Sequence, residues 1–223
     1  MPDLVKICGV STREALDAAL GAGADMVGLV RFPRSPRHLG LPLGRELSVA
    51  ARGRARRVLL VVNPDNAELE QAVEALDPDV IQLHGSETPD RVVEIRARTG
   101  REVMKAISIG GRADFAQLAR FTGAADRILL DAKPPPGASI PGGNGVPFDW
   151  SLLEGLDPRL DVMLSGGLHP ANVGDAIGRT RVRAVDVSSG VETRPGSKDP
   201  DKIRAFVTAA RAAFSAHQDR TAS

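Results

Sequence analysis

Two short turns in the last third of the chain consist of small residues that could expose the backbone to an anion. The first, Ser165-Gly-Gly167, follows the apolar run Asp161–Leu164, and the second, Ser188-Ser-Gly190, follows Ala184–Val187. Glycine-rich turns that lead into a helix donate backbone N–H groups to phosphate. Asn172 and Ser197 are expected to open the helices that follow. Either turn alone is more simply an ordinary glycine turn, but the tandem pair predicts a phosphate site at Gly166, Gly167, Ser188, Ser189 and Gly190.

A second set of polar residues falls on one face of the predicted strands. Strand side chains alternate between the two faces, and the apolar neighbours Val5, Ile7, Val185 and Val187 define the face that packs against helices. The opposite, inner face receives Lys6, Cys8, Gln82, His84, Asp131, Asp186 and Ser188. These side chains gather toward the carboxyl ends of the strands, which indicates a catalytic pocket there.

Each of these residues also has a simpler structural explanation. A lone cysteine on a strand is usually a small buried side chain, His84 could be a hydrogen-bonded core histidine, Asp131 could cap the next segment, and Lys6 could extend to solvent. Taken singly, Cys8 and His84 favour that explanation. Their shared face and shared strand end make a functional role the better interpretation of the set.

Motifs for metals and nucleotide cofactors are missing from the sequence. The four histidines are scattered without ligand spacing, and Cys8 is the only cysteine. No Gly-x-Gly-x-x-Gly, P-loop or Gly-x-Ser-x-Gly motif is present. The sequence predicts neither a metal site nor a cofactor.

The elements that must position these residues alternate regularly between strand and helix. Such alternation predicts a parallel sheet with right-handed crossovers, closed as a single (β/α)8 barrel, an α/β fold, over residues 1–223. The tail after about residue 217 is expected to be disordered. The one long irregular segment is Lys133–Phe148, a length typical of a functional or mobile loop. The predicted strands are 4–8, 26–30, 57–62, 79–83, 102–107, 127–131, 161–165 and 184–187. Predicted helices include Thr12–Leu20, Ala67–Leu76, Pro89–Arg98, Ala171–Ile177 and Asp201–Phe214.

Composition excludes several classes of protein. A net charge of +1, with arginines spread along the chain, argues against nucleic-acid binding, and aromatic content of 3% leaves few residues to stack on bases. No apolar run approaches the roughly 20 residues of a membrane span. One cysteine cannot form an internal disulfide. We expect a soluble cytoplasmic protein, with a monomer favoured and a dimer possible.

A series of motifs occurs in order along residues 4 to the closing helix. Through them the chain resembles phosphoribosylanthranilate isomerase, a (β/α)8 enzyme of tryptophan biosynthesis. The motifs are Val5-Lys-Ile-Cys-Gly9, Phe32-Pro-Arg-Ser-Pro-Arg37, Gln82-Leu-His-Gly85, Leu129-Leu-Asp-Ala132, Gly142-Gly-Asn-Gly145 with Phe148-Asp-Trp150, Leu164-Ser-Gly-Gly167 and Val185-Asp-Val-Ser-Ser-Gly-Val-Glu192.

The resemblance implies an Amadori rearrangement of a phosphorylated small molecule, with no cofactor or metal. N-(5-phosphoribosyl)anthranilate would open its ribose ring and become 1-(2-carboxyphenylamino)-1-deoxyribulose 5-phosphate. By that resemblance Asp131 is the general acid on the ring oxygen and Cys8 the base that removes the C2′ proton. Arg37 would lie near the anthranilate carboxylate, and the two small-residue turns would hold the phosphate. His84 and Asp186 are further candidates for substrate binding.

Two side chains carry more specific expectations. Lys6 and Asp186 both lie inside, on strands that are neighbours only if the sheet closes, so we predict an internal ion pair. Arg31 ends the second strand where the family usually carries an aromatic residue. We expect its stem to pack at the rim of the pocket with the charged head outside it.

Two other functions remain open from the sequence alone. One is a different barrel enzyme acting on a phosphorylated sugar or indole precursor, for which the pair of Cys8 and Asp131 would not be expected. The other is a non-catalytic protein that binds a phosphorylated ligand on a retained barrel. Activity with phosphoribosylanthranilate separates all three.

Overall fold

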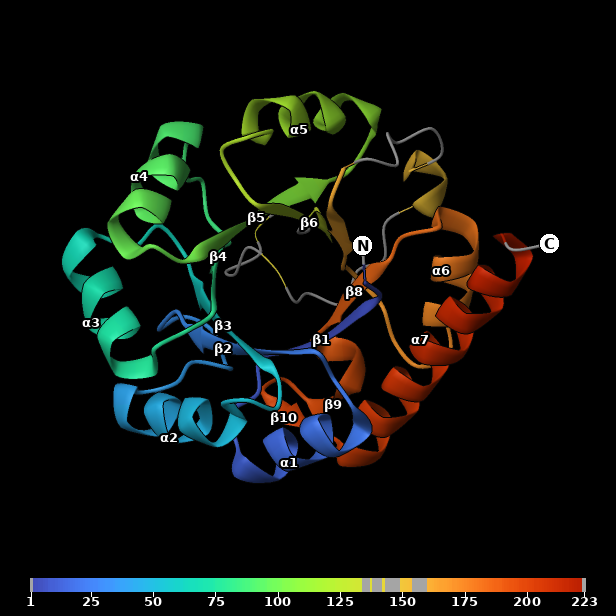
Figure 1. Ribbon diagram of the computed structural model, residues 1–223, viewed down its shortest axis with the longest axis horizontal. Helices are drawn as coiled ribbons and strands as arrows, with labels where there is room; N and C mark the ends of the chain where they lie inside the picture. The colour runs from blue at the N-terminus through green and yellow to red at the C-terminus, as the bar shows by residue number, and fades with distance from the viewer. Residues whose placement is uncertain (1, 134–136, 138–141, 143–148, 154–159, 222–223) are drawn as a thin grey trace.

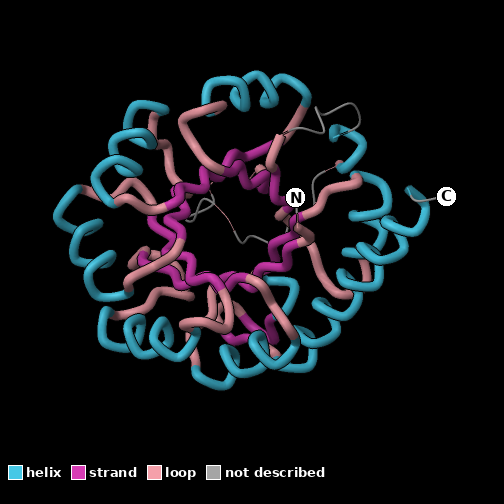
Figure 2. The backbone as a smooth tube through the Cα atoms, in the orientation of Figure 1, coloured by secondary structure: helices cyan, strands magenta, loops and turns pink. Residues whose placement is uncertain are grey.

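Eight parallel strands close into a barrel in the computed structural model, which describes residues 2–133, 137, 142, 149–153 and 160–221. Figure 1 looks down the barrel, and in Figure 2 the strands form an inner ring that the helices surround. The predicted (β/α)8 barrel is therefore confirmed. The strands are β1 Leu4–Cys8, β2 Met26–Arg31, β3 Arg56–Val61, β4 Val80–Leu83, β5 Glu102–Ile109, β6 Arg127–Ala132, β7 Val162–Leu164 and β8 Ala184–Val187.

Local capping residues decide where several helices begin. The Thr12 hydroxyl accepts a hydrogen bond from the Ala15 amide ahead of α1, and Asp65 and Glu68 form a reciprocal capping box on α3. The α-helices are α1 Arg13–Ala22, α2 Leu41–Ala51, α3 Asn66–Leu76, α4 Pro89–Thr99, α5 Ala116–Phe121, α6 Val173–Thr180 and α7 Pro200–Thr221. Short 3-10 turns are η1 Arg112–Phe115, η2 Trp150–Leu153 and η3 Ser189–Val191. None of the helices in the described ranges is long and apolar enough to cross a membrane.

One expected helix start is wrong. Asn172 immediately precedes α6 as predicted, but Ser197 lies in a short strand, β10 Ser197–Lys198, that pairs antiparallel with β9 Glu192–Arg194. Pro195 and Gly196 form the turn between them, so a hairpin takes the place of the expected helix start. The helix starts at Pro200, where the Asp199 carboxylate accepts hydrogen bonds from the Asp201 and Lys202 amides.

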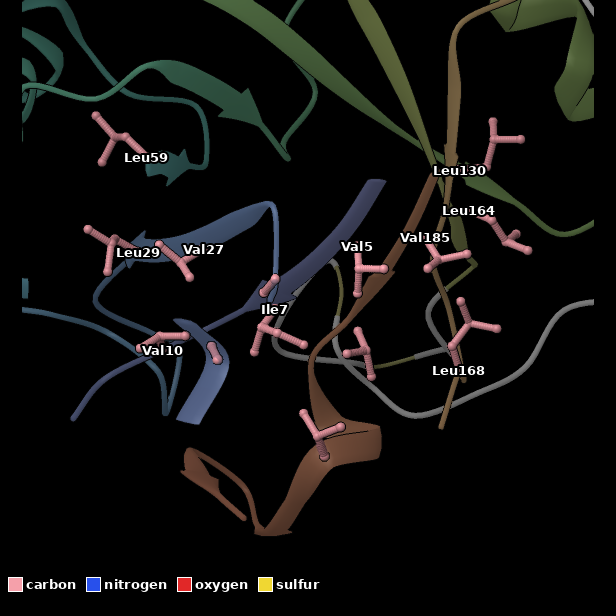
Figure 3. Close-up of a cluster of buried hydrophobic side chains, with 14 of the residues drawn as sticks. Val5, Ile7, Val10, Val27, Leu29, Leu59, Leu130, Leu164, Leu168 and Val185 are labelled. Carbon is pink, nitrogen blue, oxygen red and sulfur yellow. The ribbon is translucent and has the colours of Figure 1, made fainter. Parts of the chain in front are cut away.

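The barrel closes by pairing between β1 and β8, in a register that places Lys6 opposite Asp186. Outward-facing residues pack against the helices in the main apolar core, and Figure 3 shows Val5, Ile7 and Val185 within it. A second apolar cluster fills the barrel interior toward the amino ends of the strands. Its members are Leu4, Met26, Val58, Val80, Met104, Ala106, Leu129, Met163 and Ala184.

Two expectations on domain organisation stay predictions. We propose a single domain over the whole chain, with the one closed barrel described above as its basis. Helix α7 extends to Thr221, beyond position 217, and disorder of the tail stays a prediction. Most of the predicted loop Lys133–Phe148 lies outside the described residues.

Candidate active site

A cavity opens at the carboxyl ends of the strands and contains the predicted side chains. It is lined by Cys8, Arg37, His84, Asp131, Gly166, Gly167, Asp186, Ser188 and Ser189, among others. The space within it, part of it open to solvent, is about 760 Å³, which falls in the roughly 300–1,000 Å³ range of small-molecule sites. Gly190 does not line the cavity. A Cβ at this position would collide with the Leu168 carbonyl, so the lack of a side chain at Gly190 allows the loop after β8 to approach the loop after β7.

Lys6 and Asp186 form the predicted ion pair inside the barrel. The Lys6 ammonium lies 2.7 Å from Asp186 Oδ1, and the two side chains are 0% and 5% exposed. The other carboxylate oxygen accepts a hydrogen bond from Ser165 Oγ at 3.0 Å. Burial alone would lower the pKa of Lys6, but Asp186 and the neighbouring Cys8 outweigh it and hold that pKa above its usual value. Lys6 therefore stays a cation although it is fully buried.

Cys8 lies at the wall of the cavity, two residues beyond Lys6 on the same inner face. Burial raises the pKa of the Cys8 thiol, while Lys6 and Lys198 oppose that effect. Lys6 and Lys198 are therefore the cations that stabilise a thiolate at this position. Because burial is the larger effect, the resting protein holds a thiol with two cations nearby.

Asp131 faces the same cavity from β6 and is held by two neighbours. Its Oδ1 accepts a hydrogen bond from the Ala132 amide at 2.9 Å, and its Oδ2 lies 3.2 Å from Nε2 of His84. The other ring nitrogen of His84 is 3.0 Å from the Gln82 amide nitrogen. Gln82 is fully buried, so it fixes the ring orientation. The three side chains thus form one polar chain from β4 to β6.

Arg37 is buried against Glu192, a contact that no sequence argument assigned. Arg37 Nε and Nη2 each donate to a separate Glu192 carboxylate oxygen at 2.8 Å. The same carboxylate accepts from Lys198 Nζ at 2.8 Å. Gly9 lets Arg37 lie there, because a Cβ on Gly9 would come within 2.5 Å of the Arg37 stem.

Lys198 and Glu192 could have been found from the hairpin that carries them. The Arg194-Pro-Gly-Ser197 stretch is a turn signal, and a two-stranded pairing around it places Lys198 opposite Glu192. Burial and the charge on Arg37 lower the pKa of Lys198, and Glu192 opposes them. Burial would raise the pKa of Glu192, but Arg37 and Lys198 outweigh it and lower that pKa.

The two small-residue turns border the cavity side by side after β7 and β8. Gly166 and Gly167 have φ angles of 81° and 64°, which other residues rarely adopt. Neither glycine places a side chain between the backbone and the cavity that both residues line, and a turn with exposed backbone N–H groups suits an anion. The Asn172 side chain donates to the Gly167 carbonyl at 3.0 Å and holds the first turn in place.

Arg31 lies outside the cavity, as expected. It shares the outer face of β2 with Leu29, and its guanidinium donates to the Leu39 carbonyl and lies 3.4 Å from Nε2 of His38. It is not among the residues that line the cavity.

Among the described residues, no group of three or more His, Cys, Asp or Glu side chains is arranged to hold a metal ion. The polar groups that line the cavity suit an anionic ligand and proton transfer: a buried arginine, an aspartate beside a histidine, a thiol and two small-residue turns.

The chain is similar to one family throughout its length. A family model described as N-(5'phosphoribosyl)anthranilate (PRA) isomerase matches residues 5–209. A relative named N-(5'-phosphoribosyl)anthranilate isomerase from Azorhizobium caulinodans is 59% identical, over 95% of this chain and 93% of the relative. A relative of the same name from Bradyrhizobium diazoefficiens is 56% identical over 97% of each chain.

Solved structures agree with the sequence comparison. The phosphoribosyl anthranilate isomerase of Thermotoga maritima superimposes with a TM-score of 0.85 at 35% identity, over 95% of this chain and all of that one. A phosphoribosyl anthranilate isomerase in complex with reduced 1-(o-carboxyphenylamino)-1-deoxyribulose 5-phosphate gives a TM-score of 0.82 at 34% identity, with the same coverage.

Proposed function

The chain belongs to the N-(5'-phosphoribosyl)anthranilate isomerase family and is an isomerase of tryptophan biosynthesis, and from this premise we propose how its residues catalyse the reaction. The reaction is the Amadori rearrangement of N-(5-phosphoribosyl)anthranilate by general acid–base catalysis. The observation that carries the proposal is that Cys8 and Asp131 enter one cavity from different strands, beside the two small-residue turns.

Asp131 is the general acid that opens the ribose ring. The departing ring oxygen needs a proton, and a positioned carboxylic acid supplies it. Nε2 of His84 lies 3.2 Å from Oδ2 of Asp131, within hydrogen-bond distance of the acid. His84 thereby orients the acid and contributes to the substrate-binding wall.

Cys8 is the base that removes the C2′ proton of the Schiff base formed by ring opening. The product of that step is an enolamine, which tautomerises to the ketone. Only the thiolate can accept that proton, so the Cys8 thiol, whose pKa is raised by burial, first releases its own proton to solvent in the open cavity, and Lys6 and Lys198 stabilise the thiolate. Acceptance of the C2′ proton then returns Cys8 to the thiol. Asp186, already paired with Lys6, is placed to contact the amine or the ribose hydroxyls.

The two ends of the substrate are anionic and bind at separate places. The phosphate occupies the turns at Gly166–Gly167 and Ser188–Ser189, held mainly by backbone N–H groups. The anthranilate carboxylate binds at Arg37, whose orientation Glu192 fixes through two hydrogen bonds. We infer no metal or cofactor role, a monomer in solution and a cytoplasmic location.

Conversion of the substrate by the purified protein tests the proposal, together with rescue of a tryptophan auxotroph that lacks this step. We expect both product formation and growth. Tight binding of the reduced product without any turnover would favour a binding protein on a retained barrel. Turnover of another phosphorylated sugar or indole precursor alone would favour a different barrel enzyme.

A further inference from the structure

Lys198 is buried more deeply than a lysine on a two-residue strand near the surface would normally be. Its side chain is 1% exposed, and that of its partner Glu192 is 3% exposed. Neither residue lines the cavity, so both lie behind the wall that Arg37 and Ser188 form. Burying a charge is costly unless it has a partner, so the position of Lys198 requires an explanation.

The hydrogen bonds of Lys198 require the charged form. Its Nζ lies 2.9 Å from the Ser188 carbonyl, 3.2 Å from Ser188 Oγ and 2.8 Å from Glu192 Oε1. Ser188 Oγ donates its own proton to the Cys8 carbonyl, so it accepts the one from Lys198. Three acceptors use all three N–H groups of an ammonium, whereas a neutral amine has only two.

The charges of this cluster do not cancel. The Arg37 guanidinium and the Glu192 carboxylate neutralise each other at 2.8 Å, and Lys198 adds one further positive charge. The adjacent Lys6–Asp186 pair is itself neutral. Burial raises the pKa of Cys8, so the resting thiol does not supply the missing negative charge. Within these groups the positive charges therefore exceed the negative ones by one.

We propose that Lys198 is a specificity-determining residue, whose buried charge gives the Arg37–Glu192 pair its net attraction for the aromatic carboxylate of the substrate. The inference rests on the proposed function, which places that carboxylate at Arg37. A neutral arginine–glutamate pair can orient a carboxylate but attracts it only weakly. The charge of Lys198, behind the cavity wall, supplies the missing electrostatic attraction. Lys198 acts through its neighbours and is a positioning residue.

Two ligands that differ only in the carboxylate test the proposal. One is reduced 1-(o-carboxyphenylamino)-1-deoxyribulose 5-phosphate, and the other is the same compound without the ring carboxylate. Calorimetric titration gives the carboxylate preference, the ratio of the two dissociation constants. We expect Lys198→Met to lower that preference at least about tenfold, with Lys198→Arg retaining most of it.

Lys202→Met is the matched control. Lys202 also donates to Glu192, but to its backbone carbonyl at 2.8 Å and from an exposed position. The same substitution there removes a lysine without removing the buried charge, so the preference should stay at the wild-type value.

Three outcomes overturn the inference. An unchanged preference in Lys198→Met would make the lysine a structural support only. Equal weakening of both ligands, together with weaker binding of inorganic phosphate, would assign its charge to the phosphate turn. If the wild-type protein binds both ligands equally, the ring carboxylate does not bind at Arg37. That result would overturn the proposed carboxylate site and the inference with it. Should Lys198→Met not fold, Lys198→Gln carries the same test: it removes the charge but keeps hydrogen-bond donors at this position, so the preference must fall, and an unchanged preference refutes the role of charge.

Discussion

The inward-facing residues near the amino ends of the strands differ in kind from those near the carboxyl ends. The first group is apolar and fills the barrel floor, with Met26, Met104 and Met163 among its members. The second combines charged side chains, which include Lys6, Asp131 and Asp186, with a small apolar cluster around Val30 and Leu60. The same strands supply both groups, so two or three residues of strand length separate a packed core from a reactive cavity. Hydrophobic burial stabilises the floor, whereas the charged side chains of the upper layer are held in place by specific pairing.

The largest expected effect comes from breaking the ion pair at the boundary between these layers. Lys6→Met leaves the Asp186 carboxylate buried without its cation, and loss of one partner of a buried pair costs about 3–5 kcal/mol. Urea denaturation measures the change in the free energy of unfolding. Arg13→Met is the control, because the Arg13–Asp17 pair is 57% and 50% exposed and such pairs contribute less than about 1 kcal/mol. Similar losses in both variants would contradict the assigned importance of burial.

A substitution in the floor should reduce stability and spare catalysis. Met163 is fully buried, and truncation of such a side chain to alanine costs about 2–5 kcal/mol. Met163→Ala should unfold at lower urea concentration while its KM and kcat at low temperature stay close to those of the wild type. Val49→Ala, at a position 57% exposed, should change stability by no more than about 0.5 kcal/mol. A kcat loss that persists in folded Met163→Ala would mean that the two layers are coupled.

Substitutions of the proposed acid and base should have the opposite effect: kcat should fall. Cys8→Ser replaces the thiol by a far weaker acid, and Asp131→Asn removes the transferable proton. Each should lower kcat at least about 10²-fold, the usual scale for a positioned acid or base, with much smaller effects on binding of the reduced product. Steady-state kinetics and a separate titration measure the two quantities. Near-normal kcat in Cys8→Ser would exclude the thiol as base and make Asp186 and His84 the next residues to test.

The contrast between the layers also explains what the sequence could predict. Alternation along β1 and β8 put Lys6, Cys8 and Asp186 inside, and closure of the sheet made the Lys6–Asp186 pair predictable. Because the apolar neighbours show which face of each strand packs against the helices, the two-residue period and the residue types were sufficient to predict these inward-facing positions.

Other features depend on contacts between distant segments. The Arg37–Glu192–Lys198 cluster joins the loop after β2 to the β9–β10 hairpin, and no local pattern states that these segments meet. The expected helix start at Ser197 was wrong because two strands of two and three residues give little periodic signal. Gly190 was assigned to phosphate binding, but its lack of a side chain also serves packing against Leu168.

The phosphate turns offer a smaller effect that separates backbone from side-chain binding. Gly167 has a φ angle of 64°, so Gly167→Val would strain the turn and block close approach of the anion. We expect phosphate-dependent binding of the reduced product to weaken at least about tenfold in that variant, against about threefold or less in Ser188→Ala. Titration with the phosphorylated compound and its dephosphorylated form measures both. A larger loss in Ser188→Ala would mean that the hydroxyl, and not the backbone, holds the phosphate.

The smallest effect is expected at Arg31, which is near the mouth of the cavity but belongs to neither layer. Its guanidinium donates to the Leu39 carbonyl on the outer side of β2, so it reaches no group of the substrate. Arg31→Phe should leave KM within about threefold of wild type, because less than about 1 kcal/mol of binding is involved.

The pKa of His38 reports directly on the contact between Arg31 and His38. Burial, and after it the charge on Arg31, lowers that pKa. Removal of that charge should raise the His38 pKa, which NMR titration of the imidazole measures. Arg31→Lys keeps the charge and should leave the pKa low. A tenfold or greater rise in KM in Arg31→Phe, with the His38 pKa unchanged, would mean that Arg31 contacts the substrate and not the outer face of β2. The charged layer around the cavity would then include a residue of β2.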